Sequence, residues 1–229
     1  MRRLHVLVEG QTEETVVQKV IAPLFSSNES HVTYSICPTS RPAGGPAFKG
    51  GISTWARLQP VLRNLLRDSS ITVLTTLIDY YGFPKDGPGM PHRPHGSPRQ
   101  QVEHVERTLF DAVGDVRFLP HLALHEIEAW VLADCAQLGK FMGDSGPAAG
   151  LDRLVTQAGG PEQVNDGVDT APSKRILKAY PRFLKSADGP RVITAAGLPT
   201  IRAACPHADE WLAKLEARIL KGTDAEAPR

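Results

Sequence analysis

Short apolar runs that end in a turn alternate with amphipathic stretches through the first half of the chain. Residues 4–8 form such a run, which ends at Glu9, and residues 31–37 have the β-branched and aromatic content of a second strand. Residues 71–78 are apolar on both faces, as in a central parallel strand covered by helices, and this run ends at Asp79. We therefore expect three buried strands of one sheet.

A fourth strand is expected at residues 116–124, where Pro120 indicates an edge position or an irregularity. Apolar residues at helical spacing predict helices between and after the strands, and Thr12 is expected to cap the first of them. These helices cover residues 12–24, 55–66 and 99–113, and a further helix begins within residues 125–134.

The alternation of strands and helices predicts an α/β fold with a Rossmann-like, mostly parallel sheet of about four strands and right-handed crossovers. From about residue 137 we expect no strand, only helices separated by Gly and Pro, at residues 151–158, 173–180, 190–196 and 200–220. The predicted organisation is an α/β core over residues 1–136, a helical C-terminal region over residues 137–221 packed on that core, and a flexible tail over residues 222–229.

Acidic residues follow three of the predicted strands, at the edge where parallel sheets bind ligands. Glu9 follows the first strand, Asp79 the third, and Glu126 and Glu128 the fourth. Each of them alone could cap a turn or complement a helix dipole. Together, they offer the carboxylate oxygens that Mg²⁺ prefers, and ions held in this way bind a phosphodiester and activate water. We therefore predict a metal site for phosphodiester chemistry.

The spacing of Glu126 and Glu128 leaves open which of them faces this site. Both side chains point to one side only if the backbone is extended there. If a helix has already begun, the two side chains diverge by roughly 200° and only one faces the metal. His125 precedes them, and it is expected to act as a general acid/base or a substrate contact.

The balance of charge excludes a strongly basic coat for nucleic acid. The chain has 26 basic and 25 acidic residues and a formal net charge of +1, so any polyanion contact must be a local patch. A local basic cluster contains Lys174, Lys178 and Lys185. Lys174 and Lys178 share one face of a predicted helix, and we consider phosphate contact or a catalytic role for Lys174 against a solvated face. Lys49, in the Gly- and Pro-rich residues 40–51, is either a phosphate contact or part of a flexible loop, which we favour slightly.

The histidines and cysteines show no spacing typical of a zinc motif. His121 and His125 are four residues apart but follow Pro120, and no H-E-x-x-H occurs, so we expect no dedicated zinc site. The three cysteines are far apart, as in proteins of a reducing compartment. No apolar run approaches the length of a membrane span and no signal peptide is present, which favours a cytoplasmic location.

Several segments resemble a known family. Residues 8–13 (V-E-G-Q-T-E) resemble the E-G-x-T-E motif of TOPRIM domains, especially those of OLD-type nucleases, and residues 78–82 occupy the place of the Asp-containing second motif. Residues 125–130 (H-E-I-E-A-W) resemble the H-E-x-E-A-W segment of small, stand-alone bacterial TOPRIM-like proteins, a group of unknown function, as do residues 171–175 and 205–212.

This resemblance implies a TOPRIM core, Mg²⁺ or Mn²⁺ bound by Glu9, Asp79 and Glu126 or Glu128, and cleavage of nucleic acid. Glu13, the last residue of the first motif, is expected to contact substrate phosphate. Similar proteins are the nuclease halves of anti-phage systems that act with an ABC-type ATPase. This chain has no Walker motif, so that ATPase would be a separate partner.

One departure from the family pattern keeps other functions open. Many TOPRIM domains carry D-x-D after the third strand, whereas the second position here is Tyr81. A ligand is then missing unless Glu126 or Glu128 replaces it, and water is the expected nucleophile. The alternatives are an inert adaptor that binds a partner ATPase and a phosphotransfer enzyme for small phosphoesters. DNA or RNA as substrate, and a homodimer, stay open.

Overall fold

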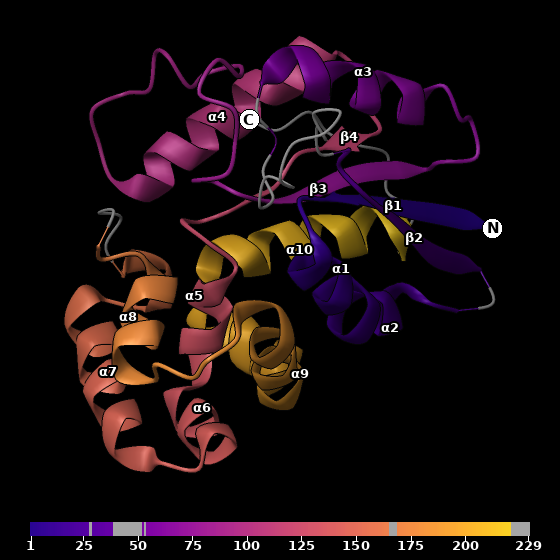
Figure 1. Ribbon diagram of the computed structural model, residues 1–229. Helices are drawn as coiled ribbons and strands as arrows, with labels where there is room; N and C mark the ends of the chain where they lie inside the picture. The colour runs from indigo at the N-terminus through magenta and orange to yellow at the C-terminus, as the bar shows by residue number, and fades with distance from the viewer. Residues whose placement is uncertain (28, 39–51, 53, 165–168, 221–229) are drawn as a thin grey trace, which may run out of the picture.

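A parallel β-sheet lies at the centre of the molecule, between two layers of helices (Figure 1). The structure is a computed structural model that describes residues 1–27, 29–38, 52, 54–164 and 169–220. Within these residues the strand order is β2-β1-β3-β4, and β5 also pairs with β3; every pairing is parallel. The predicted α/β fold is thereby confirmed. The strands are β1 (Arg2–Val8), β2 (Ser30–Ile36), β3 (Val73–Asp79), β4 (Phe118–Leu119) and β5 (Leu122–Ala123).

The single fourth strand expected at residues 116–124 is wrong, because β4 and β5 are separate pieces of two residues each. Pro120, which has no N–H for a strand ladder, marks the interruption that was predicted there. Threonine side chains of β3 pair with the interrupted backbone instead. The Thr76 hydroxyl accepts from the N–H of His121 at 2.9 Å and donates to its carbonyl at 2.8 Å.

Two helices cover one face of the sheet: α3 (Trp55–Leu66) and α4 (Pro98–Val113) (Figure 1). Their buried leucines and valines pack against apolar side chains of β3, such as Leu74. Ser97 caps α4, because its hydroxyl accepts from the N–H of Gln100 and the Gln100 amide oxygen accepts from the N–H of Ser97. Helix α4 therefore has a fixed start on this face.

The first helical segment lies on the other face and differs from its prediction. It consists of α1 (Gln11–Val16), a π-helical stretch (Val17–Ile21) and α2 (Ala22–Phe25). The expected cap at Thr12 is wrong: Gly10 is the N-cap, and its N–H donates to the Glu13 carboxylate at 3.0 Å. The π-helical stretch precedes Pro23, whose missing N–H cannot join the regular helical ladder.

From residue 128 onward the described residues contain helices and no strand, as predicted from about residue 137, and they pack on the same face. One hydrophobic cluster joins Leu4 of β1 with Trp130, Ile193 and Leu215 of this region. Among the described residues, no helix is both long and apolar enough to cross a membrane. The helices are α5 (Glu128–Val131), α6 (Cys135–Met142), α7 (Ser145–Ala158), α8 (Pro172–Ala179), α9 (Lys185–Ala204) and α10 (Pro206–Ile219).

The helix boundaries expected in this region need correction. The helix predicted at residues 200–220 is wrong, since α9 continues to Ala204 and Pro206 begins α10. Gly197, with φ 78°, breaks the regular path within α9. Helix α6 was not predicted. Residues 40–51, with Lys49, and the tail at residues 222–229 lie outside the described residues.

Candidate metal centre

Two carboxylates meet where neighbouring strands end. In the register of β1 and β3, Val8 lies opposite Leu77, so Glu9 and Asp79 follow at the same edge of the sheet. The Glu9 carboxylate accepts from the backbone N–H of Asp79 at 3.2 Å. The adjacency expected from the parallel topology is present in the structure.

A tight turn brings Glu126 and Glu128 to the same edge. His125 adopts a left-handed backbone conformation with φ 68°, which is rare for a residue other than glycine. The N–H of Ile127 donates to the Asp79 carboxylate at 2.7 Å, and α5 begins at the next residue. Carboxylate oxygens of Asp79, Glu126 and Glu128 lie within 4.8 Å of one another. Both glutamates therefore reach the site, since the backbone there is a turn rather than a strand or a regular helix.

Lys185, at the start of α9, brings a positive charge to this site; the sequence placed it in a basic cluster, but Lys174 and Lys178 were the residues selected there. Its ammonium lies 3.4 Å from a carboxylate oxygen of Glu126 and 3.4 Å from one of Glu128. The backbone N–H of Ser173, in the first turn of α8, donates to the other oxygen of Glu126 at 3.0 Å. Helices of the C-terminal region thus complete a site whose acids lie at or after the ends of β1, β3 and β5.

Burial and mutual repulsion make this cluster electrostatically costly. The pKa of Asp79 is raised well above its ordinary value, first by burial and then by the nearby carboxylates of Glu13, Glu128 and Glu9. Burial is also the main cause that raises the pKa of Glu128 to about 7, against the opposing charge of Lys185. One lysine therefore does not neutralise the cluster.

The first motif contributes a further buried acid. Burial raises the pKa of Glu13 to about 7, and the charge of Glu9 adds to this effect. The pKa of Glu9 is itself raised, mainly by burial, although the hydrogen bond from Asp79 opposes the shift. A divalent cation would lower the free energy of such a group of carboxylates when they are ionised.

The donor set fits a hard cation. The clustered groups of Asp79, Glu126 and Glu128 are all carboxylates, and Mg²⁺ and Mn²⁺ prefer oxygen ligands. The side chain of Glu128 is 3% exposed, whereas that of Glu126 is 15% exposed. Glu128 therefore lies deeper in the protein, and Glu126 lies on the solvent side.

The remaining predicted residues lie around this cluster with different contacts. His125 is buried, and its ring centroid lies 5.6 Å from that of Tyr81, the residue at the second-acid position. Glu13 is the N-terminal capping side chain described above, at the border of the cluster. Lys174 and Lys178 are exposed on α8.

The motifs that form this site lie within a region shared with other proteins. A family model described as "Domain of unknown function (DUF4276)" matches residues 8–216, which extend from the end of β1 into α10. No curated protein and no solved structure matches the chain. Because the match covers most of its length, the chain belongs to the DUF4276 family.

Proposed function

We propose that this protein is a Mg²⁺- or Mn²⁺-dependent enzyme that hydrolyses phosphodiester bonds of nucleic acid at a TOPRIM-like site. One observation carries the proposal: three carboxylates converge within 4.8 Å at the carboxyl edge of a parallel sheet. Glu9 lies beside them, and the pKa values of Asp79 and Glu128 are raised by burial and crowding. Such groups at a strand-end edge are typical of functional sites.

The residues divide into those that hold the ion and those that face substrate. Asp79, Glu9 and the buried Glu128 would hold the metal, which when bound supplies a positive charge that polarises a phosphate and promotes ionisation of water. Glu126, on the solvent side, is positioned to accept the proton of the attacking water. Glu128 would replace the second aspartate of the TOPRIM pattern, whose position Tyr81 occupies in this chain.

Lys185 has the role of charge balance next to the reacting phosphate. Its side chain is 40% exposed and its ammonium pairs with both Glu126 and Glu128, so it would meet a phosphate oxygen without leaving the site. The first turn of helix α8 contacts Glu126 through the N–H of Ser173, and the helix presents Lys174 and Lys178 to solvent. A polymer bound at the carboxylates would therefore have basic side chains beside it along α8, which favours nucleic acid over a small ester.

The test is cleavage of end-labelled DNA and RNA, single- and double-stranded, by the purified chain with Mg²⁺ or Mn²⁺. We expect cleavage that a chelator abolishes and that Asp79→Asn and Glu128→Gln reduce by at least about 100-fold. Asp111→Asn is the matched control, because Asp111 is exposed on α4. Equal cleavage by Asp79→Asn and the parent chain would refute the proposal, and cleavage of small diesters alone would limit the substrate class.

One observation favours a second candidate function, an inert adaptor that binds a partner ATPase. Lys185 already pairs with both glutamates, and Tyr81 stands at the second-acid position. An adaptor predicts no affinity for divalent metal, and partner binding that Glu9→Gln and Asp79→Asn leave unchanged. A separate ABC-type ATPase, as in the anti-phage systems named above, is the partner to test in both cases.

A further inference from the structure

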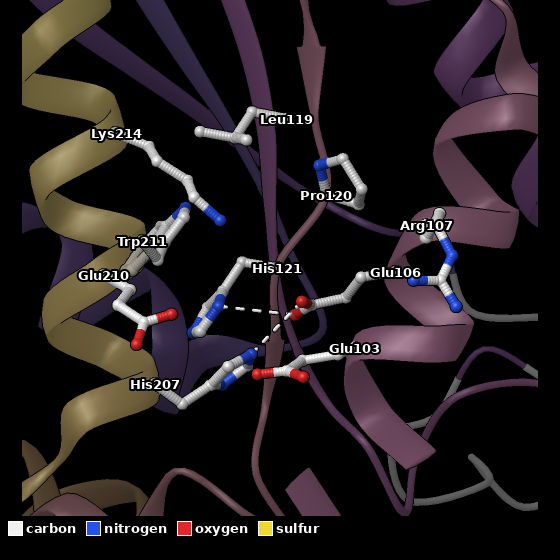
Figure 2. Close-up of a pocket in the computed structure, with 10 residues that line it drawn as sticks. All are labelled: Glu103, Glu106, Arg107, Leu119, Pro120, His121, His207, Glu210, Trp211 and Lys214. Carbon is white, nitrogen blue, oxygen red and sulfur yellow. Dashed lines mark hydrogen bonds and ion pairs between the residues drawn. The ribbon is translucent and has the colours of Figure 1, made fainter. Parts of the chain in front are cut away.

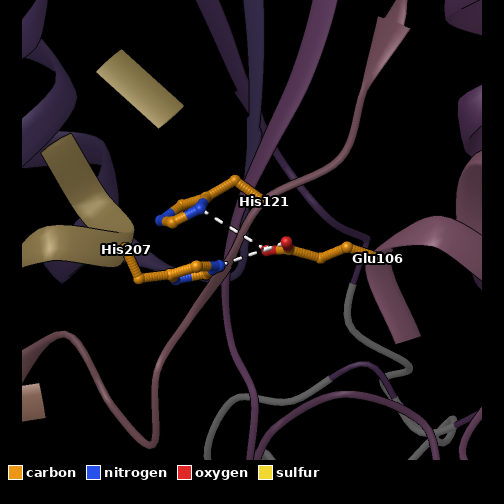
Figure 3. A group of neighbouring side chains, drawn as sticks. All are labelled: Glu106, His121 and His207. Atoms are coloured by element: carbon orange, nitrogen blue, oxygen red, sulfur yellow. Dashed lines mark hydrogen bonds and ion pairs between the residues drawn. The ribbon is translucent and has the colours of Figure 1, made fainter. Parts of the chain in front are cut away.

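A second cluster of metal-binding side chains lies apart from the carboxylate centre. It consists of Glu106 on α4, His121 between β4 and β5, and His207 in the first turn of α10 (Figure 3). A ring nitrogen of His121 lies 3.5 Å from one Glu106 oxygen, and Nε2 of His207 lies 3.1 Å from the other. Both histidines are buried. The three residues come from three elements and converge on one point.

Neighbouring groups hold the members of this cluster in place. The backbone N–H of Leu122 donates to Glu106 Oε1 at 2.8 Å, which fixes the carboxylate. His121 lies between the rings of Trp211 and His207, with centroid distances of 4.2 Å and 4.7 Å (Figure 2). The indole N–H of Trp211 donates to the Thr75 hydroxyl at 2.9 Å. The site is therefore preorganised by contacts outside the cluster.

One ligand atom from each of the three residues lies within 4.8 Å of the other two. Zinc–ligand bonds of about 2.0–2.1 Å place neighbouring ligand atoms roughly 3.3 Å apart in a tetrahedron. Each histidine lies near this spacing from one oxygen of the Glu106 carboxylate, at 3.5 Å from Oε1 for His121 and at 3.1 Å from Oε2 for His207. Among the described residues, Nε2 of His121 and Nδ1 of His207 have no hydrogen-bond partner. Exchanging the two contacts with Glu106 for metal bonds would thus break no other hydrogen bond of either ring.

The cluster borders a cavity of about 240 Å³ that leaves room for a further ligand. Its lining includes Glu103 and Glu210, which both pair with Arg99, and Lys214 of α10 (Figure 2). Catalytic zinc sites have three protein ligands and a fourth position for water or substrate. A histidine–histidine–glutamate set beside a cavity has this arrangement.

We propose that Glu106, His121 and His207 form a second metal site, for a divalent transition ion of the Zn²⁺ class, with its open position toward this cavity. Two imidazoles and one carboxylate favour such an ion over Mg²⁺, which prefers oxygen ligands alone. The ion would also link α4 and α10 to the segment between β4 and β5. This site does not depend on the nuclease proposal.

The test is titration of the metal-free, full-length protein with Co²⁺, a spectroscopic substitute for Zn²⁺. We expect the visible absorption of four-coordinate Co²⁺, without a sulfur charge-transfer band, and loss of that absorption when Zn²⁺ is added. Glu106→Gln and His207→Gln should weaken Co²⁺ binding at least about tenfold. Zn²⁺ should raise the melting temperature of the parent chain but not of His207→Gln.

Two controls separate this site from other metal binding. His104→Gln changes a histidine on the same helix outside the cluster, and Asp79→Asn disables the carboxylate centre; both should keep the Co²⁺ spectrum. Absence of four-coordinate Co²⁺ in the parent chain would overturn the proposal and leave a hydrogen-bonded triad with a structural role. Unchanged binding by both Glu106→Gln and His207→Gln would overturn it as well.

Discussion

At the scale of single residues, Gly82 allows the turn after β3 to approach the Glu9 carboxylate. A methyl group built on Gly82 would lie 2.3 Å from one oxygen of Glu9, which is closer than real atoms approach. The carboxylate, held by the N–H of Asp79, would have to move. Gly82 thus shapes the candidate metal centre although it has no side chain.

We predict that Gly82→Ala weakens Mn²⁺ binding by roughly tenfold or more, because the displaced Glu9 no longer faces the cluster. Isothermal calorimetry measures the change. Gly150→Ala is the matched control, since only a side-chain atom of Arg153, at 3.9 Å, lies near the added methyl. Equal Mn²⁺ affinity of Gly82→Ala and the control would show that Glu9 does not contribute to metal binding.

Lys185 and the lysines of α8 should affect catalysis in different ways. We predict that Lys185→Gln lowers kcat by about 100-fold, because it removes the charge beside the phosphate. Lys174→Gln and Lys178→Gln should instead raise KM and reduce its salt dependence, as expected for backbone contacts. Steady-state kinetics at two salt concentrations distinguishes the effects, with the exposed Lys140→Gln as control. A kcat of Lys185→Gln equal to that of the control would remove Lys185 from the reaction.

These residues show why the sequence predicted only part of the candidate site. Glu9 and Asp79 could be found because each follows an apolar run, and parallel topology brings such positions together. Lys185 was noted only as one member of a basic cluster, and His207 only as part of the family resemblance. Their positions beside the carboxylates could not be predicted, because long-range packing of the C-terminal helices brings them to the sheet.

At the scale of elements, the periodicity of apolar residues did not predict two features: the break between β4 and β5, and the turn at His125. Residues 116–124 alternate like one strand, but Pro120 divides them and the hydroxyl of Thr76 pairs with the gap. The left-handed backbone at His125 turns Glu126 and Glu128 onto one site. Neither a strand pattern nor a helix pattern predicts this turn. The sequence therefore left open whether the side chains of Glu126 and Glu128 point to the same side.

A histidine between β1 and β2 should make the free energy of unfolding depend on pH. His5 of β1 is buried, and its ring nitrogens contact the hydroxyls of Thr33 and Ser35 of β2 at 2.8 and 2.9 Å. Burial, aided by the charge of Arg3, lowers the pKa of His5 to about 4. Between about pH 6.5 and pH 4, His5 is therefore protonated in the unfolded chain and neutral in the folded chain, so the folded state loses stability as the pH falls through this range.

We predict that the His5 contribution to the free energy of unfolding falls by about 2 kcal/mol from pH 7 to pH 5. Urea unfolding of the parent chain and of His5→Gln gives the free energy of unfolding at both pH values. The His5 contribution is the difference between the two proteins in the slope of this free energy against pH. His92→Gln, in the exposed loop after β3, should leave the slope unchanged. Parallel slopes for the parent chain and His5→Gln would contradict the prediction.

At the scale of the whole molecule, the sheet and the C-terminal helices form the candidate sites together. The carboxylates come from the strand ends, whereas Lys185 and the N–H of Ser173 come from helices far along the chain. The second cluster likewise joins α4 to α10. The division into a core at residues 1–136 and an extension at residues 137–221 stays a prediction, and the sites need parts of both.

Calorimetric titration of the full-length chain with Mn²⁺ and Mg²⁺ shows whether the carboxylates at the strand ends bind a divalent metal. We expect binding by the parent chain and by Glu106→Gln, and loss of that binding in Asp79→Asn. The Glu106→Gln control keeps the carboxylate centre intact and changes only the second cluster. The same affinity in Asp79→Asn, or no binding by the parent chain, would contradict a metal centre at the strand ends.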